Sequence, residues 1–175
     1  MRRITATIVT TLTLLIGIGT AHAAQAPEPT HSTTVNRIEV IPKEVQPTIV
    51  FRHGDISWLP QLAAEAGWPP RTWKRLGQII LRESGGCPNR RGGDIVDKNC
   101  VVTGHDGSNH RSDTSLLQIN GVNYDLSRNK WAAVCLAKIA CTQEPLLDAV
   151  TNLRAGLVLF RIAGWDPWTP PPGGW

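Results

Sequence analysis

The chain has 175 residues, which is enough for one domain with a substantial hydrophobic core. Its formal charge at pH 7 is +4, from 18 Lys and Arg residues against 14 Asp and Glu residues. A charge this small argues against a nucleic-acid-binding protein, although a mildly basic chain suits an anionic surface.

The N-terminus has the three-part pattern of a secretory signal peptide. Two arginines precede an apolar run over residues 4–19, and Ala21 and Ala23 mark a cleavage site after residue 23. The run is short and contains several threonines, which argues against a membrane-spanning helix. Arg2 and Arg3 alone are weak evidence for twin-arginine export, and their removal lowers the charge from +4 to +2. We therefore expect a secreted, cell-wall-associated protein with no membrane anchor after cleavage.

A Pro- and Thr-rich stretch without aromatic residues follows at 24–50. This composition is typical of an extended tether, with a strand-like piece at residues 37–41. The folded domain is expected to occupy residues 51–175, which contain all seven tryptophans.

Two helices are predicted at the start of this domain. Residues 57–70 have one apolar side and end in a glycine and a pair of prolines. Residues 71–84 predict a second helix, in which the apolar residues and Glu83 fall within about 120° of one another at 100° per residue. Glu83 is therefore expected on the buried side of this helix, with Arg75 and Arg82 pointing away.

The rest of the domain is expected to combine helices with irregular connections. We expect irregular structure over residues 85–114, a short apolar segment over 115–120, a helix around 128–138 and a longer helix over 148–164. The last helix is apolar on nearly all sides and contains small residues, as expected of a central helix with close neighbours. Because no alternating strand pattern of any length is present, the expected fold is mostly α.

Glu83 is the carboxyl group best placed for catalysis. It lies on an apolar face at the C-terminal end of a helix, and both positions disfavour the ionised form of a carboxyl group. A glycosidase needs a protonated acid that donates a proton to the leaving oxygen. The alternative is a structural Glu paired with a nearby Arg, since structural ion pairs perturb carboxyl groups too.

Three stretches of this chain, ESGG at 83–86, SLLQIN at 115–120 and NLRAGLVLF at 152–160, resemble in order the signatures of the soluble lytic transglycosylase and goose-type lysozyme family. The sequence before the first signature and the final GWDPW resemble the actinobacterial and actinophage branch of lysozyme-like domains. The resemblance covers residues 55–168. It implies a lysozyme-like domain that cleaves peptidoglycan glycan strands between N-acetylmuramic acid and N-acetylglucosamine, as a monomer without a cofactor.

The resemblance also implies roles for single residues. The single catalytic acid of the family falls on Glu83, and the serine that supports this acid falls on Ser84. Gln118 matches a glutamine that reaches the substrate from the floor of the cleft. Asn152 and Gly156 match a structural pair on the central helix.

The chain departs from the family at two places. Ser115 stands where the family usually has Gly, and the later A-Y-N-A-G motif, which brings a tyrosine to the catalytic centre, is absent. The only tyrosine is Tyr124, soon after the glutamine segment. We therefore expect Ser84, Ser115, Gln118 and Tyr124 to contact the substrate.

Four cysteines in an exported chain indicate two disulfides. We expect the nearest-neighbour choice among the three pairings, Cys87 with Cys100 and Cys135 with Cys141. Six residues of straight helix rise about 9 Å, beyond the ~7 Å limit for bridged Cα atoms. The helix around residue 135 must therefore end or turn before Cys141.

Metal and thiol chemistry are disfavoured. The spacing of Cys87, Cys100, His105 and His110 matches none of the usual zinc patterns, and oxidised cysteines cannot bind zinc. No twelve-residue calcium loop closed by Glu is present. A cysteine peptidase needs a free thiolate beside a histidine, which paired cysteines do not provide. We therefore expect no metal site.

Trp165, Trp168 and Trp175 have two interpretations. They suit stacking on sugar rings, and Trp165 and Trp168 suit packing onto the domain equally well.

The outcome of cleavage depends on a second carboxylate. Transglycosylation needs none, because the 6-hydroxyl of the sugar itself attacks, and this is the simpler expectation. A hydrolytic muramidase needs a second acid, for which the sequence offers Asp94, Asp97, Asp106 and Asp113. A non-catalytic peptidoglycan-binding module is the third alternative, favoured by the missing tyrosine motif.

Overall fold

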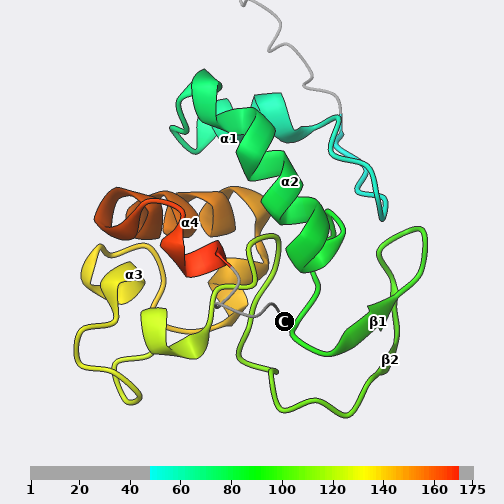
Figure 1. Ribbon diagram of the computed structural model, residues 1–175. Coiled ribbons are helices and arrows are strands. Elements are labelled where there is room, and N and C mark those ends of the chain that lie inside the picture. Colours follow the sequence, from blue (N-terminus) through cyan, green and yellow to red (C-terminus); the bar gives the residue numbers. More distant parts are fainter. Residues whose placement is uncertain (1–47, 170–175) are drawn as a thin grey trace, which may run out of the picture. The chain divides into compact units, whose positions relative to one another are not determined.

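The computed structural model describes residues 48–169 (Figure 1). It confirms that the domain is mostly α-helical, and no helix within these residues is long and apolar enough to cross a membrane. The expected signal peptide, nearly all of the tether, and Trp175 lie outside the described residues. The helices are α1 (Leu59–Glu65), α2 (Trp73–Ser84), α3 (Ala133–Leu136) and α4 (Ala149–Ala163), with short 3₁₀ turns at Pro70–Thr72, Gly121–Asn123, Glu144–Leu147 and Asp166–Trp168.

Helix α2 confirms the helix predicted over residues 71–84, except that its first two residues belong to a 3₁₀ turn. The helix ends at Gly85, whose φ of 66° is the left-handed conformation that glycine adopts without steric cost. Its buried side consists of Leu76, Gly77, Ile79, Ile80 and Ser84. Burying each of the large aliphatic side chains stabilises the domain by about 1.5–3 kcal/mol, and the packed side fixes the direction of the last turn.

Helix α4 lies at the centre of the domain, as predicted (Figure 1). It begins at Asp148, whose carboxylate accepts a hydrogen bond of 2.8 Å from the backbone N–H of Thr151. It contacts α1, α3 and the 3₁₀ turns Glu144–Leu147 and Asp166–Trp168. Gly156 lies against the side chain of Leu117, where an added Cβ has no room. The small residues of α4 therefore allow its close neighbours.

The stretch over residues 85–114 contains a small sheet, which the sequence analysis did not predict. Strands β1 (Asp94–Val96) and β2 (Val102–His105) pair antiparallel, with Asp94 opposite His105. All residues of β2 are exposed, so the strand has no alternation of buried and exposed positions. Strands of three and four residues without that alternation leave no periodic signal in the sequence.

The helix predicted around residues 128–138 is wrong in its extent, because α3 spans only Ala133–Leu136. The side chain of Asn129 accepts a hydrogen bond of 3.0 Å from the backbone N–H of Trp131. This side-chain bond offers the backbone an alternative to the helix, and such bonds favour turns.

Both predicted disulfides are present. The Cα atoms of Cys87 and Cys100 are 5.3 Å apart, and those of Cys135 and Cys141 are 4.4 Å apart. Helix α3 ends at Leu136, and Lys138 has a φ of 59°, so the chain turns back before Cys141. The expected break between these two cysteines is confirmed.

Candidate active site

The centre of the site is a tight backbone turn at residues 115–119, here called the cleft-floor turn. The hydroxyl of Ser84, at the end of α2, lies 3.0 Å from the carbonyl oxygen of Leu116. The carbonyl of Leu117 accepts a hydrogen bond of 3.0 Å from Nε1 of Trp168, and its backbone N–H donates one of 2.9 Å to the side chain of Asn152. The end of α2, helix α4 and the turn at 166–168 therefore all hold this one segment.

Asn152 is fully buried, and its side-chain amide forms hydrogen bonds with three backbone groups. Besides accepting the bond from Leu117, its Nδ2 donates to the carbonyl oxygens of Thr114 at 3.0 Å and Leu146 at 3.2 Å. A buried amide is favourable only when it is hydrogen-bonded in this way. Asn152 therefore has the structural role that was expected of it.

The cleft-floor turn has an unusual backbone. Ser115 and Gln118 have φ values of 65° and 45°, in the left-handed region that costs an L-residue roughly 1–2 kcal/mol. The hydroxyl of Ser115 is buried and has no hydrogen-bond partner among residues 48–169. These two features show physically why a glycine suits position 115 better than the serine does.

Replacing Ser115 by Gly is therefore expected to stabilise the domain. The change relieves the left-handed strain and removes the unpartnered hydroxyl, and these gains exceed the ~0.5–1 kcal/mol that glycine loses through the greater entropy of the unfolded chain. We expect the free energy of unfolding to rise by about 1 kcal/mol. Urea titration of the Ser115→Gly variant measures it, and a lower unfolding midpoint would contradict the prediction.

Glu83 borders two adjoining hollows. The first, of about 210 Å³, lies over the cleft-floor turn and is lined by Glu83, Asp113, Leu117, Gln118, Ile119, Asn120, Asn123, Leu159, Pro167 and Trp168. The second, of about 380 Å³, is lined by Arg82, Glu83, His110 and Asp113. The side chain of Glu83 is 21% exposed, so part of it is accessible to a ligand although most of it is covered.

Arg82 is exposed, in agreement with its predicted position away from the buried side of α2, but its side chain turns toward Glu83. Its Nη2 lies 2.6 Å from Oε1 of Glu83 and also donates to the carbonyl oxygen of Trp168. Within residues 48–169, no other group hydrogen-bonds the Glu83 carboxylate. Arg82 and Glu83 are neighbours in the sequence, so their ion pair connects no two elements. The hydrogen bond from Arg82 to Trp168 is the contact that connects α2 to the turn at 166–168. The alternative of a purely structural Glu therefore finds only partial support in this contact.

Only one of the four predicted substrate contacts lines a hollow with Glu83. Gln118 does so, and its Nε2 donates a hydrogen bond of 2.8 Å to the carbonyl oxygen of Ser115. Ser84 and Ser115 line neither hollow, and both are fully buried. Tyr124 is 5% exposed and lines a different hollow.

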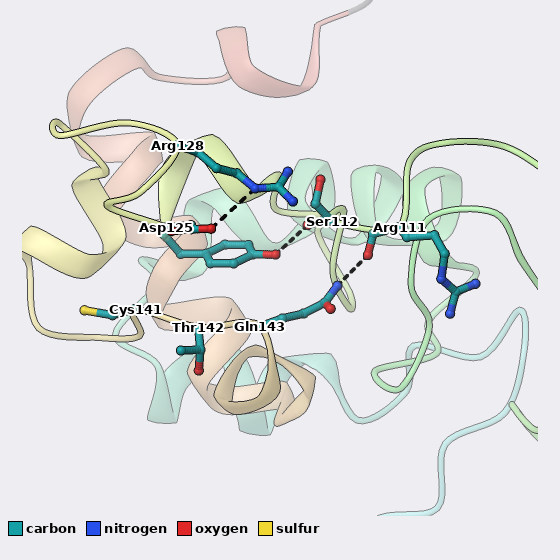
Figure 2. Close-up of a pocket in the computed structure, with 8 residues that line it drawn as sticks. Arg111, Ser112, Asp125, Arg128, Cys141, Thr142 and Gln143 are labelled. Atoms are coloured by element: carbon teal, nitrogen blue, oxygen red, sulfur yellow. Dashed lines mark hydrogen bonds and ion pairs between the residues drawn. The ribbon is translucent and has the colours of Figure 1, made fainter.

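That other hollow is drawn in Figure 2 and combines groups from residues 111–112, 124–128 and 141–143. The hydroxyl of Tyr124 donates a hydrogen bond of 2.8 Å to the carbonyl oxygen of Ser112. Burial is the largest influence on this phenol and raises the pKa of Tyr124. A buried, neutral phenol bonded to the backbone is a packing group, so Tyr124 does not replace the missing family tyrosine.

The four aspartates considered as a second acid differ in their surroundings. Asp94 is buried, with Oδ1 3.2 Å from a guanidinium nitrogen of Arg111. Asp97 accepts two backbone N–H groups and closes its own turn. A hydrogen bond from the Ser108 backbone holds the pKa of Asp106 below its usual value, which makes Asp106 a weaker base.

Asp113 is the one of the four that lines hollows with Glu83, and it lines both of them. Its Oδ1 accepts a hydrogen bond of 2.5 Å from Nδ2 of Asn120, and its Oδ2 lies 3.7 Å from Nδ1 of His110. The sequence alone does not distinguish Asp113 from the other three, because spacing along an irregular stretch does not fix where each side chain lies.

The tryptophans near the site mainly pack. Trp165 stacks on Trp68 with ring centroids 5.7 Å apart, and Trp168 is 5% exposed. Trp168 borders the first hollow. Residues 48–169 contain no group of three or more His, Cys, Asp or Glu side chains placed to hold a metal ion. All four cysteines are paired, so no thiolate is available to a cysteine peptidase.

Comparison of the chain with known proteins gives no match. No protein-family model, no curated protein and no solved structure is similar to it. Its function must therefore be inferred from its own residues and geometry.

Proposed function

We propose that this chain is a secreted, lysozyme-like enzyme that cleaves the β-1,4 glycan strands of bacterial peptidoglycan between N-acetylmuramic acid and N-acetylglucosamine. The proposal rests on one observation, which is that the three stretches resembling the family signatures lie together at one place. Ser84 and Asn152 both bond to the cleft-floor turn, and this turn brings Gln118 to the hollow that Glu83 borders. An interlocked arrangement of this kind supports a common function for the three stretches.

In the proposed reaction Glu83 protonates the glycosidic oxygen, and the C–O bond of the leaving sugar breaks. The 6-hydroxyl of the muramic acid then attacks C1 and returns its proton to Glu83, which leaves a 1,6-anhydro end. No cofactor takes part in these steps.

Loss of turbidity of purified cell walls tests this proposal against the binding-module alternative. The enzyme is expected to clear a wall suspension and to release soluble fragments. A protein that sediments with the walls without clearing them would instead be a binding module.

Hydrolysis is the second candidate outcome, and one observation favours it. Asp113 borders both hollows of Glu83, is 22% exposed and is oriented by Asn120. A carboxylate across a cleft from the acid is the arrangement with which an inverting glycosidase activates water.

Mass spectrometry of the released muropeptides separates the two outcomes. Transglycosylation predicts fragments lighter by one water, and it predicts that Asp113→Asn keeps activity within about threefold, because no step uses a second acid. Fragments with reducing ends, together with a loss of about 100-fold or more in Asp113→Asn, would replace transglycosylation by hydrolysis. Asp97→Asn is the control, since Asp97 only closes its own turn.

A further inference from the structure

A third hollow adjoins the candidate active site along α2. It has a volume of about 320 Å³ and is lined by Arg75, Gln78, Ile79, Arg82, Trp168 and Thr169. It shares Arg82 with one of the Glu83 hollows and Trp168 with the other. Arg75 and Arg82 are seven residues apart and so lie on one side of the helix, two turns from each other. We call this region the arginine hollow.

The arginine hollow contains one guanidinium group without a carboxylate partner. Two guanidinium groups line it, and no carboxylate within residues 48–169 does, but that of Arg82 is paired with Glu83 from the neighbouring hollow. The guanidinium of Arg75 lies 5.1 Å from the ring centroid of the partly buried Trp165, and this contact restricts its freedom. Arg75 forms no ion pair with any residue between 48 and 169. Its planar donors are therefore exposed and already oriented.

The free Arg75 suits a carboxylate, because a guanidinium presents two parallel N–H groups that match the two carboxylate oxygens. The sugars themselves offer no such group where a peptide is attached, because the lactyl carboxyl group of muramic acid is then part of an amide bond. The peptides attached to the muramic acid units of peptidoglycan do, since peptides carry carboxylates at their ends and on acidic side chains. We propose that the arginine hollow binds a carboxylate of the peptide beside the bond that is cut, so that the enzyme prefers peptide-bearing strands to peptide-free glycan. This inference rests on the proposed function.

Arg75 is the residue to test, because Arg82 also contacts Glu83 and its replacement mixes two effects. Wild type is expected to show a kcat/KM about tenfold higher on peptide-bearing strands than on strands stripped of peptides by an amidase and then amidated at the lactyl carboxylates that this exposes. Arg75→Gln should lose this preference through a higher KM, with stripped strands cleaved as before. Arg75→Lys keeps the charge but not the paired donors and should fall between the two. Arg161→Gln, at an exposed position of α4, is the matched control and should behave as wild type.

Binding is measured separately from cleavage, so that a failure of the proposed peptide binding can be distinguished from a failure of the proposed function. The inactive Glu83→Gln variant is sedimented with both kinds of strand, with and without Arg75→Gln. Selective retention by peptide-bearing strands that Arg75→Gln abolishes supports the inference, even if no variant cleaves and the proposed function fails. Two results overturn the inference and leave the proposed function standing. The first is equal retention or equal cleavage of the two kinds of strand by the protein with Arg75 intact. The second is a preference for peptide-bearing strands that persists in a folded Arg75→Gln variant.

Discussion

Replacing Glu83 by Gln is expected to lower the rate of wall cleavage by about 10³-fold or more. The amide keeps the shape of the side chain but cannot transfer a proton to the glycosidic oxygen. The side chain makes no hydrogen bond beyond Arg82 within residues 48–169, so the fold should be unaffected. Release of soluble muropeptides measures the rate, and circular dichroism measures the fold.

The matched control for this prediction is Glu65→Gln. Glu65 lies at the exposed end of α1, with a guanidinium nitrogen of Arg154 3.9 Å from its carboxylate. This exposed pair contributes little to stability, and Glu65 borders none of the hollows near Glu83. Wild-type cleavage is expected from this control. Near-wild-type cleavage by a folded Glu83→Gln variant would move the catalytic acid to another residue.

Replacing Asn152 by Ala is expected to have the largest effect on stability. The change leaves the backbone N–H of Leu117 and the carbonyl oxygens of Thr114 and Leu146 without their partner in a fully buried position. Each buried polar group that loses its partner costs about 1–3 kcal/mol. We expect the free energy of unfolding to fall by about 3 kcal/mol or more, as measured by urea titration.

The same variant should lose cleavage as well, because the cleft-floor turn that carries Gln118 loses its tie to α4. Asn99→Ala changes an exposed asparagine and is expected to shift stability by less than about 0.5 kcal/mol. A drop of under 1 kcal/mol in Asn152→Ala would show that the three bonds contribute little to the fold.

The helices that could be predicted are those whose apolar residues repeat with the helical period. Helix α2 and helix α4 have long apolar sides, and burial of these sides determines their position, whereas Gly85 ends α2 and Asp148 begins α4. Helix α3 has four residues and no such repeat, so turn-forming side chains such as Asn129 decided the local structure instead. The hairpin β1–β2 was not predicted either, because its side chains are mostly exposed and so give no repeat of apolar residues.

The candidate site could be predicted only in part. The motif residues Glu83 and Gln118 do border one hollow, because the segments that carry them are fixed by buried partners. Ser84 and Ser115 are motif residues too, but a motif does not distinguish a residue that touches substrate from one that holds the backbone. The turn of Arg82 toward Glu83 could not be foreseen, since a long exposed side chain is directed by tertiary contacts, here the carbonyl of Trp168.

The most direct test of the proposed function is the analysis of soluble products from purified peptidoglycan whose peptides are intact. The purified domain is incubated with the walls, and the supernatant is examined by mass spectrometry. The proposal predicts disaccharide-peptide fragments from wild type and none from Glu83→Gln. Free peptides without sugars, or walls that bind the protein and release nothing, would contradict the assignment of Glu83 as the acid of a glycan-cleaving enzyme.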